Sequence, residues 1–416
     1  MHGRHTRSGR ILYLLALSAI ALLLAATAPP AVAHRWVFRL LHSFANGADF
    51  GGTDGSQPLS GLVIDKSGNL FGATFAGGAN GGGTVFEVTP DGRERVVYSF
   101  CAVANCADGQ YPNGVIMDAS GNLYGTTYFG GANAGGALFE VMPDGRETVL
   151  HSFCSPQCAD AWGPASGLIM DAAGDLYGTA ELGGANGGGT VFELTRGGVE
   201  RVLYSFGSAE NFADGFSPIA GLLMGSGGVL YGTTLVGGAN DGGTAFALRP
   251  GGETVLHSFC SVADCADGFL PSSVLIADRS GNLYGTAQNS SSGTFATDGG
   301  TVFQLTPEGV ETVLYTFCSL ENCLDGRNPW AGLLGRRDGS LFGTTYGGGA
   351  FGYGTVFRIA PGGSERVLHS FCSAPNCLDG QGPVAPLIMD RSGNLYGTTQ
   401  AGGAYRGGTV FELVCE

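Results

Sequence analysis

The amino-acid sequence predicts an all-β fold, a seven-bladed β-propeller with four antiparallel strands in each blade. Three observations predict it: a phrase that recurs seven times, four strand-like segments between its copies, and chain ends that complement each other. The phrase reads HSF, YSF or YTF, and successive copies lie 53 to 58 residues apart. The copies end at Phe44, Phe100, Phe153, Phe206, Phe259, Phe317 and Phe371.

Each repeat follows the same order. In the third repeat, a first strand is predicted at Gly167–Asp171, and the Asp-x-x-Gly turn after it suits a type I turn closed by a left-handed glycine. The second strand, of the LYGTT type, has a central glycine, which indicates close backbone packing against a neighbour. A loop of the GGANGGG type leads to a third strand, TVFEL. A short glycine-containing turn leads to the fourth strand, which ends at the recurring phrase.

The two ends of the chain hold complementary parts of one repeat. The last repeat has strands at 385–390, 395–399 and 409–414 and lacks the fourth, whereas residues 35–44 form a fourth strand alone. Joined, they complete a seventh blade, so the N-terminal strand closes the ring and leaves no long open edge. We therefore predict one propeller domain over 34–416. Its blades are 45–100, 101–153, 154–206, 207–259, 260–317, 318–371, and 372–416 together with 35–44.

The first 33 residues have the pattern of a secretory signal peptide. Three arginines precede the apolar run Ile11–Ala26, and Ala31-Val32-Ala33 supplies the small residues of a cleavage site before His34. An uncleaved anchor is the alternative. No second apolar stretch approaches the roughly 20 residues of a membrane span. We expect a secreted, extracellular or periplasmic chain with no membrane span in its mature form.

The mature chain is strongly acidic. It carries 17 Lys and Arg, which is 20 less the three of the leader, against 35 Asp and Glu, a net charge of about −18. Its only lysine is Lys66. Such a chain lacks the basic groups that neutralise phosphates, which argues against nucleic acid and against anionic membranes as partners.

Five repeats carry a cysteine pair directly after the fourth strand. Each pair lies alone in its blade, and export favours oxidation, so we expect five disulfides; zinc is the alternative, but its sites usually need converging pairs. The expected bonds are Cys101–Cys106, Cys154–Cys158, Cys260–Cys265, Cys318–Cys323 and Cys372–Cys377. The loops that start at Ala45 and Gly207 have no cysteine, and Cys415 is left over as a free thiol, an intermolecular bridge or an incidental residue.

The repeat text GNLYGTT…GG…GGTVFEL…LHSF resembles the GloVer-type tandem repeat of exported bacterial proteins. The resemblance covers Arg35–Glu416 and implies export, but it implies no chemistry. Many members carry a C-terminal anchoring or sorting signal, whereas this chain ends at FELVCE.

An aspartate precedes a Gly-x-x-Pro segment, or a variant of it, in every repeat. One interpretation is that each Asp caps its own turn; the other is a ring of carboxylates that holds cations or sugar hydroxyls. Calcium needs six to eight converging oxygens, so we expect no metal site and no cofactor. The aspartates are Asp54, Asp108, Asp160, Asp214, Asp267, Asp325 and Asp379.

Aromatic residues lie beside these aspartates in blades two to six. They differ from blade to blade while the frame stays constant, so they are candidates to stack on sugar rings; the alternative is that they wedge between blades. The candidate ligand-binding residues are Tyr111, Trp162, Phe216, Phe269 and Trp330, with Asp108, Asp160, Asp214, Asp267 and Asp325.

The sequence shows no catalytic constellation. The histidines before Ser-Phe, such as His151, alternate with tyrosines, which indicates a packing position on an outer strand. We therefore expect a secreted non-enzymatic binding module that recognises a glycan or an envelope protein through the face of the disulfide loops. The alternative is a propeller-type hydrolase or lyase acting at the mouth of the channel.

Overall fold

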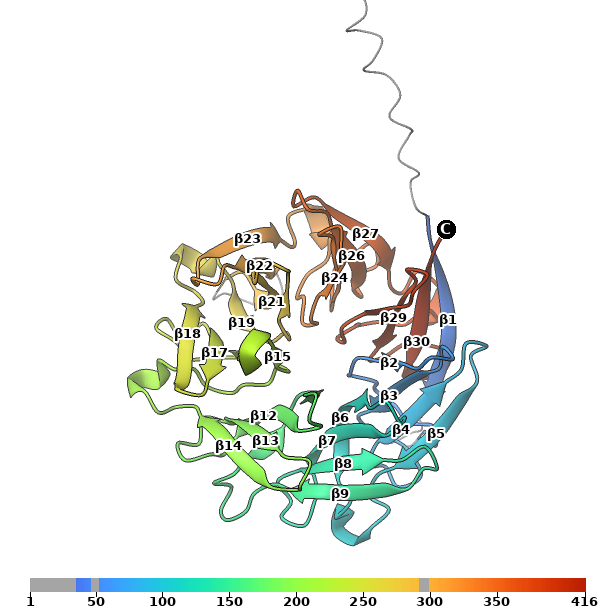
Figure 1. The fold of residues 1–416 in the computed structure, drawn as a ribbon. Coiled ribbons are helices and arrows are strands. Elements are labelled where there is room, and N and C mark those ends of the chain that lie inside the picture. The colour runs from blue at the N-terminus through green and yellow to red at the C-terminus, as the bar shows by residue number, and fades with distance from the viewer. Residues whose placement is uncertain (1–34, 46–51, 292–298) are drawn as a thin grey trace, which may run out of the picture. The chain divides into compact units, whose positions relative to one another are not determined.

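A computed structural model describes residues 35–45, 52–291 and 299–416 of the 416-residue chain. The signal peptide predicted over 1–33 lies outside the described residues. The compact unit Trp36–Cys415 consists of seven antiparallel sheets arranged in a ring (Figure 1), so the prediction of a seven-bladed β-propeller is confirmed.

Each sheet runs from a short inner strand to an outer strand. In the first three blades the strands are β2 (Val63–Ile64), β3 (Leu70–Thr74), β4 (Thr84–Val88) and β5 (Glu94–Ser99); β6 (Gln110–Met117), β7 (Leu123–Phe129), β8 (Ala137–Val141) and β9 (Glu147–Ser152); and β10 (Trp162–Pro164), β11 (Ile169–Met170), β12 (Leu176–Leu182), β13 (Thr190–Leu194) and β14 (Glu200–Ser205).

The next three blades repeat this order. Their strands are β15 (Leu223–Met224), β16 (Leu230–Thr234), β17 (Thr244–Arg249) and β18 (Gly252–Ser258); β19 (Phe269–Pro271), β20 (Ile276–Ala277), β21 (Leu283–Asn289), β22 (Thr301–Leu305) and β23 (Glu311–Thr316); and β24 (Leu334–Gly335), β25 (Leu341–Thr345), β26 (Thr355–Ile359) and β27 (Glu365–Ser370).

The seventh blade joins the two ends of the chain, as the sequence predicts. Its sheet has the order β1 (Trp36–Ala45), β30 (Arg406–Cys415), β29 (Leu395–Thr399) and β28 (Ile388–Met389). The outer strand β1 pairs with β30 in antiparallel register from Trp36 opposite Cys415 to Ala45 opposite Arg406. The N-terminal strand therefore closes the ring with main-chain hydrogen bonds.

The phenylalanine of each recurring phrase inserts into the next blade. Phe153 follows β9 of the second blade, and its ring packs against Phe192 of the third blade, with ring centroids 4.9 Å apart and planes inclined at 56°. Both rings are fully buried, in a cluster with Leu138 of the second blade and Leu168 of the third. The repeated Phe is thus the main apolar contact between neighbouring blades.

The glycine at the centre of each second strand makes room for this core. A Cβ atom added to Gly178 in β12 would lie 2.6 Å from the tip of the Phe192 ring and 3.0 Å from Leu168. What this glycine accommodates is therefore side chains, the Phe192 ring and Leu168, where the sequence predicted a close approach of neighbouring backbone.

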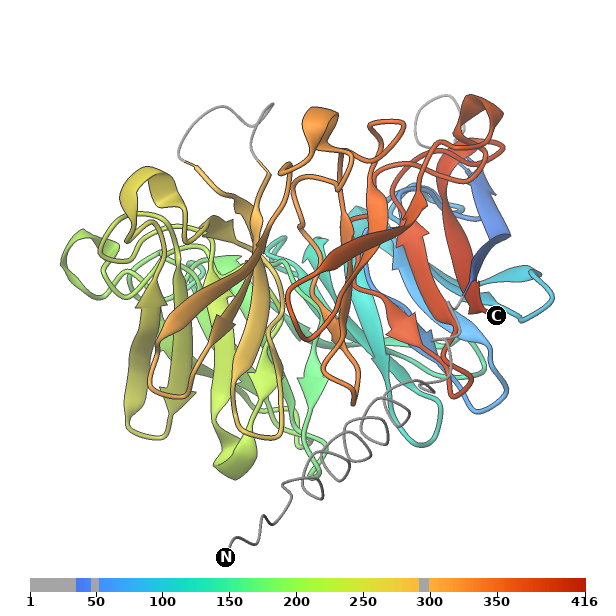
Figure 2. The ribbon, with the colours of Figure 1, turned by 90° about the horizontal axis from the view of Figure 1, so that it is seen from above.

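Two kinds of loop share one end of the ring, which we call the loop face. They are the cysteine loops, between a fourth strand and the next blade, and the glycine-rich loops between second and third strands. Within one repeat, hydrogen bonds join the two loops. For example, the Gly184 amide donates a hydrogen bond to the Cys158 carbonyl (2.9 Å). Figure 2 shows the ring from the side, with the short 3-10 turns of the cysteine loops at one end.

The short 3-10 turns are the only helical segments among the described residues, and none of them could span a membrane. On the loop face they are η1 (Ala104–Cys106), η2 (Glu210–Phe212), η4 (Ala263–Cys265), η5 (Glu321–Cys323) and η6 (Pro375–Cys377); η3 (Ser226–Gly228) follows β15.

The five cysteine pairs that the sequence indicates are all bonded. The disulfides are Cys101–Cys106, Cys154–Cys158, Cys260–Cys265, Cys318–Cys323 and Cys372–Cys377, and Cys415 is free. Disulfides in this number are typical of proteins outside the cytoplasm.

Removing one disulfide should have a modest effect on stability. In the chain-entropy model, closing a loop of this length stabilises the folded state by about 2 kcal/mol. The free energy of unfolding of the double variant Cys318→Ser, Cys323→Ser should therefore be about 2 kcal/mol lower than that of the parent. Urea unfolding measures this difference. Cys415→Ser is the matched control, because Cys415 is unbonded and should leave the midpoint unchanged. An unchanged midpoint in the double variant would contradict the prediction.

Candidate binding face

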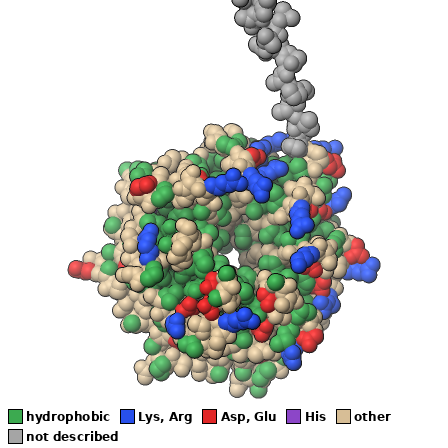
Figure 3. Space-filling view, in the orientation of Figure 1, with side chains coloured by type: hydrophobic (Ala, Val, Ile, Leu, Met, Phe, Trp, Pro, Cys, Tyr) green, Lys and Arg blue, Asp and Glu red, His purple; other side chains and the backbone are tan. Residues whose placement is uncertain are grey.

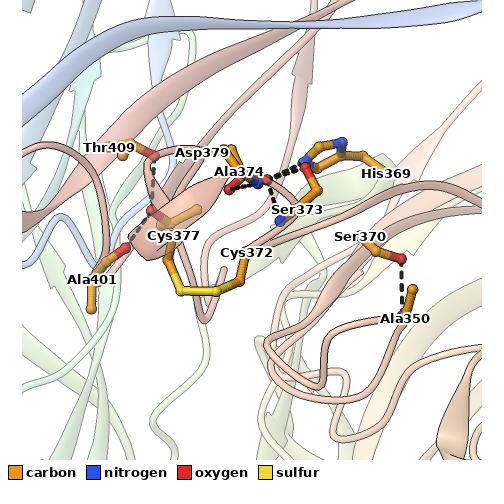
Figure 4. A network of polar contacts seen from close by, with 11 residues as sticks. Ala350, His369, Ser370, Cys372, Ser373, Ala374, Cys377, Asp379, Ala401 and Thr409 are labelled. Atoms are coloured by element: carbon orange, nitrogen blue, oxygen red, sulfur yellow. Dashed lines mark hydrogen bonds and ion pairs between the residues drawn. A yellow bond between two sulfur atoms is a disulfide. The ribbon is translucent and has the colours of Figure 1, made fainter.

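Each cysteine loop is organised around one aspartate. Figure 4 shows the loop that ends at Asp379. One carboxylate oxygen, Oδ2, accepts hydrogen bonds from the Ser373 amide (3.0 Å) and hydroxyl (2.7 Å), and Oδ1 accepts one from the Ala374 amide (3.1 Å). The Nε2 atom of His369 lies 3.1 Å from Oδ2. The carboxylate therefore links the loop to the preceding outer strand.

The five candidate aspartates occupy the same position in their own loops. Their exposed fractions are between 0% and 7%, and each accepts bonds from amides five and six residues before it. A Tyr or His of the preceding outer strand also forms a hydrogen bond with each aspartate. The pairs are Tyr98 with Asp108, His151 with Asp160, Tyr204 with Asp214, His257 with Asp267, and Tyr315 with Asp325. These carboxylates are engaged within the loops and offer little surface to a ligand.

The loop bonds lower the pKa of Asp214. Burial alone would raise the pKa of Asp214, but the hydrogen bonds that Ser208 and Tyr204 donate outweigh burial and lower it. For His257 the balance is reversed: burial lowers its pKa below the usual value, despite the attraction of Asp267.

A buried glutamate of the outer strand that follows in the chain faces six of the seven loop aspartates, and the sequence analysis missed it. Each lies six residues before a recurring Phe, and its Oε1 atom is buried without a hydrogen-bond partner among the described residues. Burial is the largest cause that raises the pKa, and the aspartate opposite raises it further. The pKa is about 7 for Glu94, Glu147, Glu253, Glu311 and Glu365, and it is also raised for Glu200.

The seventh blade has Phe38 in place of this glutamate. The Phe38 ring stacks on His369, with centroids 4.3 Å apart and planes 14° apart. The constant Glu in six repeats, and its replacement by Phe in the strand that closes the ring, was a readable signal in the sequence.

Two of the five candidate aromatics belong to a continuous run on the loop face. Tyr111 stacks on Phe75 of the first blade (4.5 Å, 13°) and meets Phe129 edge-on at 6.0 Å. Trp162 of the third blade meets Phe129 at 5.5 Å and Tyr128 at 5.7 Å. All five rings are half-buried, so they fill the gaps between blades and still present an edge or face to solvent.

The run ends at a carboxylate. The hydroxyl of Tyr128 donates a 2.6 Å hydrogen bond to Glu181 Oε2 of the third blade, and this interaction, together with burial, raises the pKa of Tyr128. The first three blades thus share a surface of aromatic rings beside an acidic hydrogen-bond acceptor.

The other three candidate aromatics lie apart from this run. Phe216 packs on Phe212 of the same loop at 5.1 Å, and Phe269 lies in β19 opposite Asn289. Trp330 is 37% exposed and stacks on Tyr346 at 4.6 Å with parallel planes. The sequence offset does not account for the separation, because Trp162 stands two residues after its loop aspartate, as Phe216 and Phe269 do after theirs.

Blades six and seven add exposed aromatics that the sequence analysis did not identify. In the first four blades an asparagine of the glycine-rich loop donates to an outer-strand carbonyl, as Asn133 does to Ser152 (3.1 Å). Phe351 and Tyr405 stand in that slot in blades six and seven, and they are 50% and 64% exposed. Tyr353, two residues after Phe351, is 47% exposed.

A central cavity of about 400 Å³ runs along the inner strands, and Figure 3 shows the molecule hollowed at the centre of the ring. Every blade contributes to its wall, through residues such as Ser60, Asn113, Ser166, Ser273 and Trp330. None of the described residues that line it carries an acidic, basic or imidazole side chain. The wall therefore offers hydrogen bonds and apolar contact but no group for proton transfer at neutral pH.

Solved structures share the fold at low sequence identity. The extracellular domain of a protein described as a one-component system from B. thetaiotaomicron matches with a TM-score of 0.54 and 10% identity, over 90% of this chain and 39% of that one. The chain therefore spans about 39% of the length of that structure, and the likeness shows the fold alone.

Two further matches are weaker. A protein described as a gluconolactonase matches with a TM-score of 0.45 and 14% identity, over 92% of this chain and 93% of its own. A protein described as a 6-phosphogluconolactonase from Bacteroides uniformis ATCC 8492 matches with a TM-score of 0.47 and 14% identity, over 78% and 86%.

The repeat shows to which family the chain belongs. No curated protein matches the chain by sequence. The profile of the Gloeobacter/Verrucomicrobia repeat matches it three times, at residues 35–222, 98–297 and 270–415. The chain therefore belongs to the Gloeobacter/Verrucomicrobia repeat family, as its resemblance to the GloVer-type repeat predicted.

Proposed function

We propose that this protein is an exported, non-enzymatic binding module that recognises a glycan through the aromatic side chains of its loop face. The observation that carries the proposal is the run Phe75, Tyr111, Phe129, Tyr128 and Trp162, which is contiguous over three blades and half-buried. Rigid aromatic faces offer large contact area at a low cost in conformational entropy. Glu181, at the end of the run, supplies a hydrogen-bond acceptor for a sugar hydroxyl.

The disulfides and aspartates support this role indirectly. They hold the loops that carry the aromatics, so the rings are positioned before a ligand arrives, which reduces the ordering cost of binding. Asp108 and Asp160 thereby act in this proposal through the loops they hold.

The composition of the cavity wall favours binding over catalysis. A hydrolase or lyase at the channel mouth would need carboxylates, histidines or a metal at the inner strands, and the lining residues supply none of these groups. Five disulfides and the predicted leader support an extracellular or periplasmic location for this module.

Intrinsic tryptophan fluorescence tests the proposal. The chain has three tryptophans, and Trp36 lies in β1 against Phe342, away from the aromatic run. In a Trp36→Phe background, titration with a panel of oligosaccharides should give a saturable emission shift. Trp162→Ala in that background should weaken binding by about tenfold, equivalent to about 1.4 kcal/mol, as measured by calorimetry.

The matched control is Phe216→Ala, an aromatic change on the same face outside the run, which should bind as the parent does. Equal weakening in both variants would point to a general loss of loop structure. A flat response to the whole panel would overturn the glycan proposal and favour a protein partner. The exposed aliphatic side chains of the cysteine loops, such as Val103, Val262 and Leu320, would then be the first residues to change.

A further inference from the structure

One junction between blades gathers three possible metal ligands from three separate elements. His42 lies in β1, the outer strand of the seventh blade; Asp54 ends the loop into the first blade; and Glu94 begins β5, the outer strand of the first blade. One ligand atom of each lies within 4.8 Å of the other two, and His42 Nε2 is 3.2 Å from Asp54 Oδ2. All three residues are half-buried.

Two other junctions hold the same residue types and provide an internal comparison. They are His151 with Asp160 and Glu200, and His257 with Asp267 and Glu311. Within the described part of the chain, only the group at His42 brings three ligand atoms this close together.

The aspartates of these junctions also differ in exposure. Asp54 stands ten residues after its recurring Phe, whereas Asp160 and Asp267 stand seven and eight residues after theirs. The Asp54 side chain is 22% exposed, compared with 7% for Asp160 and 2% for Asp267. The loops of Asp160 and Asp267 are closed by disulfides, and the loop of Asp54 contains no cysteine. The Asp54 carboxylate is therefore more accessible than those of Asp160 and Asp267.

The ligand set selects the kind of ion. One imidazole and two carboxylates suit Zn²⁺ and related first-row metals, whereas Ca²⁺ requires six to eight oxygen ligands. In a tetrahedral zinc site, ligand atoms about 2.0 Å from the metal lie about 3.3 Å apart, and His42 and Asp54 already have that spacing. The buried Oε1 of Glu94 has no hydrogen-bond partner among the described residues and is available to complete the set.

We propose that His42, Asp54 and Glu94 form a Zn²⁺ site that clamps the N-terminal strand to the first blade. Zinc would connect the closing strand to its neighbour at a junction whose loop has no disulfide. The remaining coordination position belongs to water. The sequence does not reveal this site, because the three ligands are 12 and 40 residues apart and come from different blades.

Calorimetric titration of Zn²⁺ into the full chain, purified without a histidine tag, tests the site. We expect saturable binding of one ion per chain and a rise in Tm on saturation. His42→Ala and the isosteric Glu94→Gln should each weaken binding at least tenfold. The matched control is Glu311→Gln, the same change at a junction that does not gather its ligands, and it should bind Zn²⁺ as the parent does.

Two outcomes would overturn the proposal. One is the absence of saturable Zn²⁺ binding. The other is binding that survives in Glu94→Gln, since the remaining histidines and the thiol of Cys415 are present in that variant and would account for it. Because Glu94→Gln only removes a charge from a buried position, its Tm without zinc should equal or exceed that of the parent, which separates loss of binding from loss of folding.

Discussion

Replacing Asp325 with alanine is expected to lower the free energy of unfolding by about 3 kcal/mol, since hydrogen bonds to a charged group contribute about 1.5–3 kcal/mol each and are not additive. Asp325 is fully buried, and its Oδ2 accepts bonds from Tyr315 (2.9 Å) and from the amide (2.9 Å) and hydroxyl (2.8 Å) of Ser319. Alanine leaves these donors without their acceptor and releases the loop from β23. Chemical unfolding followed by circular dichroism measures the loss.

A surface aspartate of the same blade provides the control. Asp338 accepts one amide bond, from Ser340, in an exposed turn, so Asp338→Ala should cost less than about 1 kcal/mol. Tyr315→Phe removes one donor to Asp325 and should cost about 1 kcal/mol in the parent, but little in the Asp325→Ala background. Equal losses for Asp325→Ala and Asp338→Ala would show that the buried network does not hold the loop.

The protein should become less stable as the pH rises from 4.5 to 7. Glu147, Glu253, Glu311 and Glu365 have a folded pKa of about 7, against an ordinary value of 4.5. In that interval the folded state binds more protons than the unfolded state, so stability falls with rising pH and levels off above pH 7. After discounting for solvent screening of half-buried groups, each contributes about 1 kcal/mol. Together they should lower Tm by about 5 °C.

Other groups titrate nearby and must be separated from this effect. His257 and His369 have pKa values lowered by burial, so they oppose the trend by adding stability as the pH approaches 6.5. Glu147 faces Asp108 and Tyr98, with no histidine in its junction, and is the clean test. Glu147→Gln should flatten the fall of Tm between pH 5 and 7.5. The exposed Glu308→Gln is the control, and an identical pH profile for both variants would refute this origin.

The repeat made the fold predictable from the sequence. Strands that alternate with Gly and Asp turns recur seven times, and a lone fourth strand at 35–44 matches a last repeat that lacks one, so closure by pairing of β1 with β30 followed from counting. The five disulfides followed in the same way, because each cysteine pair is local to one loop. Features that lie within a single repeat depend on short-range chain geometry, which the sequence shows directly.

The candidate site could be predicted only in part, because it depends on contacts between repeats. Tyr111 and Trp162 share a surface because each packs on aromatics of the preceding blade, whereas Trp330, which follows the proline of its segment, lines the central cavity. An offset of two or three residues in a loop changes the direction of a side chain, and no repeat pattern records that direction.

The sequence by itself determined the number of blades, the closing strand and the disulfide pairs of this protein. Only the tertiary structure decided which side chains meet across the blade junctions: the six glutamates that face loop aspartates, the Phe38 that stacks on His369, and the approach of His42, Asp54 and Glu94. The physical reason is that these contacts join residues that are distant in the sequence, and the spacing between them is set by the twist and packing of whole sheets and not by the local chain.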